Sequence, residues 1–343
     1  MQENHSATQT GTPNKLADFP IRTLILSMGM PMVLSMVLQA VYNIVDTVFI
    51  SHMKNGATAV LALTDSYSIQ LLIVAVGVGT GIGINALLSK TLGERNSEKA
   101  ACIAGNGIFL AICIYAVFLL FGIFGTKPFI AMQANGNALR QEMGEQYLRI
   151  CCMGSFGSIG YTVYERFLQG TGRTNLSTIA QITGAALNIL LDPLFIFGLD
   201  MGVVGAAVAT VVGQCVAAVV AFVCNHKFNH EISLSFKGYS PDFKIMGTIY
   251  AIGIPSIIMQ SIGSIMTYAM NRILIGFSST AAAVFGVYFK LQSFFFMPVF
   301  GLNNGITPII AFNYGAQNRK RMVKTIKLSM ATAFCIMLFG FLC

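Results

Sequence analysis

Two aspartates stand in stretches of sequence that are otherwise apolar enough for lipid: Asp46 in VYNIVDTVFI and Asp192 in NILLDPLFIF. Helical spacing places Asn188 on the same face as Asp192, one turn earlier. A charged group at bilayer depth is costly, so by default it serves a function and has a partner. Two neighbouring carboxyl groups can hold one proton between them, because both cannot ionise cheaply at short range. Their oxygens, together with those of Asn188 and Thr210, would equally suit Na⁺, since hard cations prefer oxygen ligands.

Polar residues near these aspartates recur at helical spacing, so each group shares one helix face. The amides predicted to line a polar cavity beside the carboxyl groups are Gln39, Asn43, Gln181 and Gln214. Asp46 and Asp192 fall about one or two turns from the outer ends of their predicted helices. Thr210 lies about two turns into the next helix, which runs back the other way, so all three can meet at one level. The alternative is that both aspartates are merely solvated near helix ends.

Three further polar residues could face the same cavity. Glu165 is deep in a predicted helix beside Arg166, where a structural ion pair and a transport role are both open. Lys290 lies within GVYFKLQSFFF, and its side chain could extend to the membrane surface or face the cavity. Gln260 is the third candidate, and we treat all three as possible substrate contacts.

Two prolines interrupt the helices that carry the aspartates. Pro31 precedes Asp46 by about four turns, and Pro193 directly follows Asp192. Proline cannot donate a backbone hydrogen bond, so each helix is weakened there and can bend. The sequence therefore predicts hinges at Pro31 and Pro193, the second of which could respond to protonation of the adjacent carboxyl group.

The chain as a whole has the composition of a membrane protein. Of its 343 residues 55% are hydrophobic and 10% are charged, whereas soluble domains carry about a quarter charged residues. The mean hydropathy is +0.70. Long apolar runs predict an all-α polytopic membrane protein with helices at residues 24–50, 59–90, 101–125, 140–170, 174–199, 203–225, 245–273, 281–312 and 325–343. The net charge of +8 is therefore a topology signal and does not indicate binding to nucleic acid.

The basic residues are distributed unevenly between the two sides of the membrane. One side holds most of them, including the cluster at 319–327, which places that side and the N-terminus in the cytoplasm. The predicted parts of the chain are a polar cytoplasmic tail at 1–22, an N-lobe of six helices at 23–225, a cytoplasmic linker at 226–244 and a partial C-lobe of three helices at 245–343.

An internal repeat relates the two lobes. MGMPMVLSMVLQAVYNIVDTVFI from Met28 resembles IGIPSIIMQSIGSIMTYAMNRIL from Ile252, and GTGIGINALLSKTLGERN resembles GLNNGITPIIAFNYGAQN. The positions that coincide include Gly79 with Gly301, Gly83 with Gly305, Gly93 with Gly315 and Asn96 with Asn318. The offset spans six helices, so both copies enter the membrane in one direction, as in the parallel repeats of secondary transporters. The chain ends in the third helix of the second copy, so we expect it to be truncated at its C-terminus.

These features together resemble the MATE (multidrug and toxic compound extrusion) family of the MOP exporter superfamily. The strings that carry the resemblance are VYNIVDTVFIS, GTGIGINALLSKTLGERN, LQGTGRT, NILLDPLFIFGLDMGVVGAAVATVVGQ and FFFMPVFGLNNGITPIIAFNYGAQN. The resemblance implies twelve helices, about nine of them present here, in two pseudo-symmetric lobes around a central cavity. It also implies multidrug efflux of amphipathic or cationic compounds, driven by antiport of Na⁺ or H⁺. We therefore expect a monomeric, multi-pass protein of the plasma membrane that is no enzyme and needs no cofactor besides the coupling ion.

The acidic pattern is similar to that of the DinF-like branch, in which the N-lobe carries the ion site. The resemblance assigns ion coupling to Asp46, Asn188, Asp192 and Thr210, with Na⁺ as one possible ion. Two positions depart from that branch, because Glu165 replaces an expected Asn and the Arg expected after it falls near Gln169.

Other functions compete with this interpretation. A flippase for lipid-linked precursors on the same scaffold would favour several basic residues in the cavity, to hold a pyrophosphate. A transport-inactive fragment is a second alternative. An intramembrane aspartyl protease would place an aspartate in a GxGD context, and neither Asp46 nor Asp192 has one.

Overall fold

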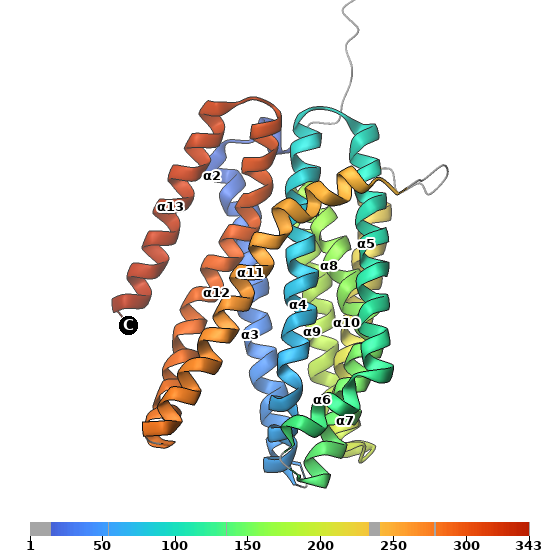
Figure 1. Cartoon of the computed structure of the whole chain (residues 1–343). Helices are drawn as coiled ribbons and strands as arrows, with labels where there is room; N and C mark the ends of the chain where they lie inside the picture. The colour runs from blue at the N-terminus through green and yellow to red at the C-terminus, as the bar shows by residue number, and fades with distance from the viewer. Residues whose placement is uncertain (1–14, 54, 135, 233–240, 278, 343) are drawn as a thin grey trace, which may run out of the picture.

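The computed structural model describes residues 15–53, 55–134, 136–232, 241–277 and 279–342, and it is helical throughout its regular structure (Figure 1). The helices, of which η1 and η2 are π-helical, are α1 Lys15–Asp18, α2 Ile21–Leu24, η1 Ile25–Gly29, α3 Met30–Ser51, α4 Gly56–Gly93, α5 Ser97–Phe124, α6 Thr126–Gln133, α7 Ala138–Met153, α8 Ser155–Gly170, α9 Thr174–Pro193, η2 Leu194–Gly198, α10 Gly202–Phe228, α11 Phe243–Phe277, α12 Ser279–Gly315 and α13 Arg319–Leu342. The side chains of Asn43, Lys290 and several of their neighbours lie outside the described residues.

Seven helices in the described part of the chain are long and apolar enough to cross a membrane. The fold is therefore the predicted all-α polytopic one. Two further predicted crossings correspond to α12, which has 37 residues, and to α7 with α8, which have 16 residues each. The single helix expected at 140–170 is thus interrupted at Gly154. A Cβ atom at Gly154 would lie 2.4 Å from the Val211 side chain, so this break lets the chain pack closely on α10.

The turns at the two repeat-related positions have the same backbone geometry. Arg95 and Gln317 occupy equivalent positions and have φ angles of 59° and 55°. The next residue caps the following helix in each copy, because the Asn96 side chain accepts from the Lys99 amide at 2.9 Å and Asn318 accepts from the Arg321 amide at 3.1 Å. The repeat is therefore present in the backbone conformation as well as in the amino-acid sequence.

Repeat-related glycines pack reciprocally on the other half of the molecule. Gly79 of α4 faces Gly253 of α11, and a Cβ atom at Gly253 would lie 2.6 Å from the Gly79 carbonyl oxygen. Gly301 of α12, the partner of Gly79 in the repeat, instead contacts the backbone of Met32 and Val33 in α3. Each half thus presents its second long helix to the first long helix of the other, as a pseudo-twofold axis along the membrane normal would require.

The two halves are in contact at the end of the bundle that holds the N-terminus. A Cβ atom at Gly93 would lie 2.1 Å from the Phe312 carbonyl oxygen, and one at Gly315 would lie 2.0 Å from that of Lys90. At the opposite end, the ends of α11 and α12 lie apart from those of α3 and α4 (Figure 1). The helices therefore form a V that is closed on the N-terminal side.

A guanidinium group fastens the N-terminal segment to the second half. Arg321 of α13 donates from Nη2 to the carbonyl oxygens of Leu16 at 3.2 Å and Phe19 at 2.8 Å. Its Nε donates to the Asn313 side chain at 3.2 Å. One side chain thus ties α1 and α13 to α12, across a sequence separation of about 300 residues.

An ion pair holds the other end of the first half. Arg140 of α7 donates to both carboxylate oxygens of Asp65 in α4, at 2.6 and 2.5 Å. Asp65 is only 5% exposed, so the pair replaces the hydration that the carboxylate loses. This explains an acid that would otherwise look out of place at the start of an apolar helix.

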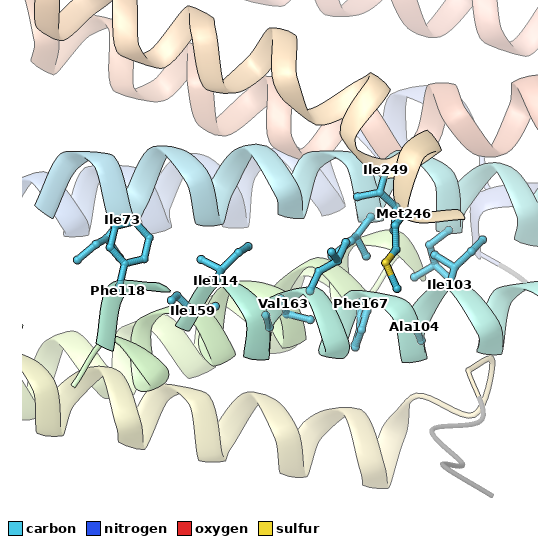
Figure 2. Close-up of a cluster of buried hydrophobic side chains, with 14 of the residues drawn as sticks. Ile73, Ile103, Ala104, Ile114, Phe118, Ile159, Val163, Phe167, Met246 and Ile249 are labelled. Atoms are coloured by element: carbon cyan, nitrogen blue, oxygen red, sulfur yellow. The ribbon is translucent and has the colours of Figure 1, made fainter. Parts of the chain in front are cut away.

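The main hydrophobic cluster lies between α4, α5, α8 and the start of α11 (Figure 2). Its members include Ile73 of α4, Ile114 and Phe118 of α5, and Phe167 of α8, which is fully buried. Phe167 follows Glu165 and Arg166 directly, so the packing that anchors α8 also fixes the direction in which these two charged side chains point.

Candidate ion and substrate site

Asn188 and Asp192 contact each other on α9. The Asn188 amide donates to Asp192 Oδ1 at 3.3 Å, and both residues are buried, with exposed fractions of 4% and 0%. The other carboxylate oxygen of Asp192, Oδ2, and the side-chain amide oxygen of Asn188, Oδ1, are buried without a hydrogen-bond partner. A buried polar oxygen without a partner is costly, so this pair is suited to receive a proton or a cation.

Thr210 is positioned by a glycine crossing between α9 and α10. A Cβ atom at Gly184 would lie 2.7 Å from the Gly213 carbonyl oxygen, and one at Gly213 would lie 3.1 Å from Cβ of Asn188. The two backbones therefore touch at this point. Asn188 sits one turn from the contact on α9, and Thr210 lies three residues before Gly213 on α10, so both face the same space.

Asp46 lies on α3, the helix that packs against the other side of α9. The Ser35 hydroxyl donates to Thr178 at 3.1 Å, and the Gln181 amide donates to Gln39 Oε1 at 3.3 Å, which fixes the register of the two helices. Asp46 Oδ1 is buried and, like Asp192 Oδ2, lacks a hydrogen-bond partner. The two carboxyl groups thus lie on helices that pack against each other.

A cavity of about 160 Å³ lies among α3, α4, α8, α9 and α10. Its lining includes two residues of the predicted ion site, Asn188 and Thr210, and four of the predicted cavity residues, Gln39, Glu165, Gln181 and Gln214. Asp46 and Asp192 are not among the described lining residues, whereas Asn188 both lines the cavity and contacts Asp192. The two aspartates therefore lie outside the cavity lining, and Asn188 connects the cavity with Asp192.

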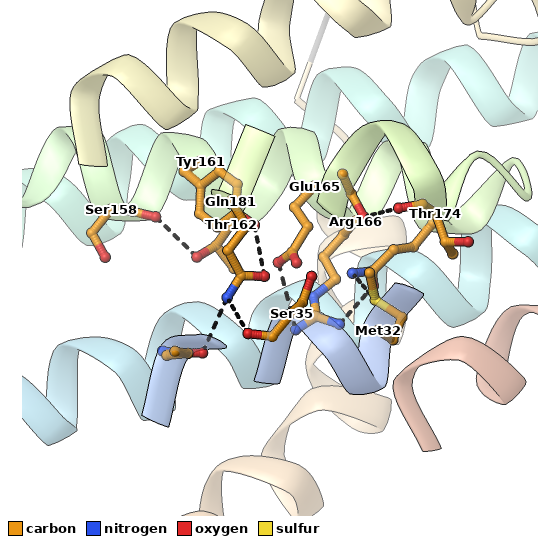
Figure 3. A network of polar contacts seen from close by, with 12 residues as sticks. Met32, Ser35, Ser158, Tyr161, Thr162, Glu165, Arg166, Thr174 and Gln181 are labelled. Carbon is orange, nitrogen blue, oxygen red and sulfur yellow. Dashed lines mark hydrogen bonds and ion pairs between the residues drawn. The ribbon is translucent and has the colours of Figure 1, made fainter. Parts of the chain in front are cut away.

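The cavity contains a charged pair on α8 (Figure 3). The nearest Arg166 nitrogen is 4.0 Å from Glu165 Oε2, and Arg166 Nη1 donates to Gln169 at 2.8 Å. Arg166 is 2% exposed, and its Nε has no hydrogen-bond partner. Arg166 thus reaches Gln169, the position where the resemblance leads one to expect an arginine.

Tyr161 of this network is not among the residues predicted from the sequence, and Arg166 was considered there only as the neighbour of Glu165. The Tyr161 hydroxyl donates to Gln181 at 3.4 Å, and Tyr161 precedes Glu165 by one helical turn. That spacing was a usable signal. The contribution of Arg166 was harder to foresee, because the residue lies next to Glu165 and only the packing of α8 shows that both line the cavity.

Each predicted hinge proline adjoins a π-helical segment. Pro31 lies just after η1, and Pro193 precedes η2. Pro31 has no N–H for the carbonyl oxygen of Ser27, four residues earlier. The Thr174 hydroxyl, at the start of α9, donates to that oxygen at 3.4 Å instead. The carbonyl oxygen that Pro31 leaves without its helical donor is therefore hydrogen-bonded by α9, the helix that carries Asp192.

Three of the predicted cavity residues are not placed in the cavity. Gln260 of α11 is partly buried and is absent from the described lining of the cavity. The side chains of Asn43 and Lys290 lie outside the described residues.

The sequence of the chain matches the MatE family at residues 31–194 and 255–343, which is most of its length. The chain belongs to the MatE family. The resemblance to MATE transporters of the MOP superfamily is thereby confirmed. This MatE protein is a polytopic membrane transporter, and the family comprises transporters rather than enzymes.

Two curated relatives illustrate the similarity. The "Multidrug export protein MepA" of Staphylococcus aureus is 25% identical over 321 residues, which is 92% of this chain and 70% of the relative. The protein of the same name from Staphylococcus haemolyticus is 26% identical over 316 residues, or 91% of this chain and 69% of the relative.

Solved structures show the same arrangement. One is described as the outward-facing conformation of a multidrug resistance MATE family transporter of the MOP superfamily. It shares 25% identity and a TM-score of 0.88 over 96% of this MatE chain and 73% of its own. A second, described as a crystal structure of MATE in complex with MaD5, gives a TM-score of 0.86 at 25% identity, over 96% of this chain and 74% of its own.

Proposed function

We propose that the protein exports amphipathic or cationic compounds by antiport, with Na⁺ or H⁺ bound by Asp46, Asn188, Asp192 and Thr210. The observation that carries this proposal is a set of three buried oxygens without partners, one each on Asp46, Asn188 and Asp192. They lie on the facing helices α3 and α9, beside a polar cavity.

The chemistry follows from the cost of isolated charge. A lone ionised aspartate in hydrocarbon would take up a proton and keep it. Two carboxyl groups near each other, with neutral oxygens alongside, can instead exchange between an empty state and a state with one proton or one Na⁺. Sodium fits the donor set, because every available group is an oxygen of the kind that hard cations prefer.

Coupling requires the ion to affect the cavity, and binding linkage makes that effect reciprocal. Asn188 supports this link, because it contacts Asp192 through its amide and also lines the cavity. An ion that draws the Asn188 carbonyl oxygen toward Asp192 would alter the cavity wall. In the same way, a substrate that holds Asn188 would alter the affinity for the ion.

The cavity is suited to a cationic amphipath. Glu165 supplies a carboxylate at its wall, while Met36, Ile73 and Val74 supply apolar surface. The relatives are named multidrug export proteins, which supports export of drug-like small molecules. We further propose that the protein is a monomer in the plasma membrane. We place its N-terminus in the cytoplasm, because the basic cluster at 319–327 lies on the N-terminal side.

The test is dye uptake by inverted membrane vesicles that contain the whole protein, because export moves dye into the lumen of such vesicles. A fluorescent cationic dye is added outside, and a H⁺ gradient or a Na⁺ gradient, higher in the lumen, is imposed separately. We expect uphill dye movement with at least one gradient in the wild type and none with Asp192→Asn. Gradient-independent dye movement, or equal movement by Asp192→Asn, would refute ion coupling at this site.

A further inference from the structure

A second cavity lies at the N-terminal end of the bundle, far from the acids. Its volume is about 290 Å³. It is formed by α1, the segment from α2 to η1, the turn between α8 and α9, and the last residue of α10. Its lining has two basic side chains, Lys15 and Arg173, and two aromatic ones, Phe19 and Phe228. Neither the ion site nor the substrate cavity uses any of these residues.

Arg173 is incompletely satisfied in this cavity. Its Nε is buried and has no hydrogen-bond partner. Burial raises the pKa of the Glu231 carboxyl group and the nearby Arg173 guanidinium opposes that shift, so these two side chains interact. Lys15, Arg173 and Glu231 together still carry a net positive charge when all three are ionised. An anion that approached Arg173 from within the cavity would meet a donor already held in place.

The start of α9 contributes to the same space. Arg173 is the N-cap residue, and no side chain caps this helix of 20 residues. Asn175 and Leu176, in its first turn, line the cavity. The Leu176 amide is already bonded to the Arg173 carbonyl oxygen at 3.0 Å, so α9 contributes through the positive end of its dipole, which favours an anion and adds to the effect of the two basic side chains.

The remaining walls are apolar. Leu24, Met28 and Leu176, with the two phenylalanines, form most of the surface that is not basic. A free phosphate ion would gain nothing from these side chains, whereas an acyl chain would be buried by them. The position also fits a lipid, since basic pockets between transmembrane helices near the membrane surface bind anionic headgroups.

We propose that this cavity, defined by Lys15, Phe19, Arg173 and Phe228, binds an anionic phospholipid, with the phosphate between the two basic side chains and an acyl chain along the aromatic ones. In the orientation proposed above, the lipid comes from the cytoplasmic leaflet. Phosphatidylglycerol represents the class.

The bound lipid acts on the helices that carry the acids. Ser27 and Met28 of η1 line the cavity on one side, and Asn175 and Leu176 of α9 line it on the other. The Thr174 hydroxyl already joins α9 to the Ser27 carbonyl oxygen between them. A headgroup held by Arg173 strengthens this junction, so an anionic lipid stabilises the closed N-terminal end of the bundle.

Native mass spectrometry of the purified chain in detergent micelles tests the proposal. Separate samples receive phosphatidylglycerol in the micelles, phosphatidylcholine in the micelles, or inorganic phosphate in the buffer. No ion gradient is present, so the result is independent of transport. We expect the wild type to retain one phosphatidylglycerol molecule. The double variant Lys15→Gln with Arg173→Gln should bind it about ten- to thirty-fold more weakly, given the contribution of each basic residue near a membrane surface.

Two variants serve as controls. Lys324→Gln removes one charge from an exposed site on α13 and should keep wild-type binding. Arg173→Lys keeps the charge, so it should retain most of the preference for phosphatidylglycerol over phosphatidylcholine. Retained binding in this variant would show that the loss in the double variant is not caused by misfolding. The proposal fails if phosphatidylcholine is retained equally, if Lys324→Gln matches the double variant, or if inorganic phosphate displaces the lipid at equal concentration.

Discussion

The Asn188 amide donates to Asp192 at 3.3 Å, and the remaining side-chain oxygen of each residue is buried without a partner. This pair therefore offers two buried acceptors on α9. Asp46 adds a third from the facing helix. The arrangement is incomplete by one positive charge or proton, which is the property expected of a site that an ion occupies in one part of a transport cycle.

Removal of the charge at Asp192 should uncouple transport without emptying the cavity. Asp192→Asn preserves shape, so dye binding measured by fluorescence polarisation should stay within about two-fold, while uphill efflux falls at least ten-fold. Met270 is the repeat equivalent of Asp46 and is the matched control; Met270→Ala should lower efflux only slightly. Equal losses in the two variants would argue against an ion site confined to the first half.

Substitution at the crossing of α9 and α10 should destabilise the protein. Gly184→Ala places a methyl group 2.7 Å from the Gly213 carbonyl oxygen, so the helices must separate. We expect a cost of about 1–3 kcal/mol, seen as a lower melting temperature in detergent. Gly247→Ala is the control, because a Cβ atom there meets nothing within 4 Å. It should be neutral or slightly stabilising, since alanine favours a helix over glycine.

The ion pair of Asp65 and Arg140 should behave as a unit. Arg140→Gln leaves a buried carboxylate unpaired and should cost about 3 kcal/mol of stability. The double variant with Asp65→Asn should recover part of that loss, because no charge then remains buried. A double-mutant cycle based on melting measurements checks this. Simple additivity would show that the two side chains do not interact in the membrane.

The Arg321 contacts should protect the N-terminal segment. Arg321→Gln removes the donors to the Leu16 and Phe19 carbonyl oxygens, so hydrogen exchange should rise about ten-fold in peptides that cover residues 15–24. Lys324→Gln, one turn further along α13, removes an equal charge and should leave exchange unchanged. Exchange that is the same in both variants and the wild type would mean that hydrophobic packing alone holds this segment.

The orientation can be examined by labelling. On a background without native cysteines, a cysteine at Asn318 should resist an impermeant thiol reagent in intact cells, and one at Asp200 should react. The positive-inside distribution of basic residues is the reason. The reverse pattern would invert the proposed direction of transport.

The contact between Asn188 and Asp192 was predictable, because helical periodicity alone aligns the two on one face of a predicted helix. The fold class followed from apolar run length. Other features depend on contacts between distant helices. The break at Gly154 reflects the Val211 side chain on α10. The Gly154 break has no local sequence pattern, whereas the i, i+3 spacing of Arg166 and Gln169 on α8 was a usable local signal.

The bond from Thr174 to the Ser27 carbonyl oxygen gives the first and fifth crossings a common pivot. Asp46 lies nineteen residues beyond Ser27, and Asp192 lies eighteen beyond Thr174, so each carboxyl group is about 27–29 Å along its helix from this point. A tilt of about 5° between the two helices would then move the acids by about 2.5 Å relative to each other, given the helical rise. If the two carboxyl groups bind one proton between them, as proposed, a displacement of this size would change how they share it. A small rotation at one membrane surface would then alter the ion affinity near the other.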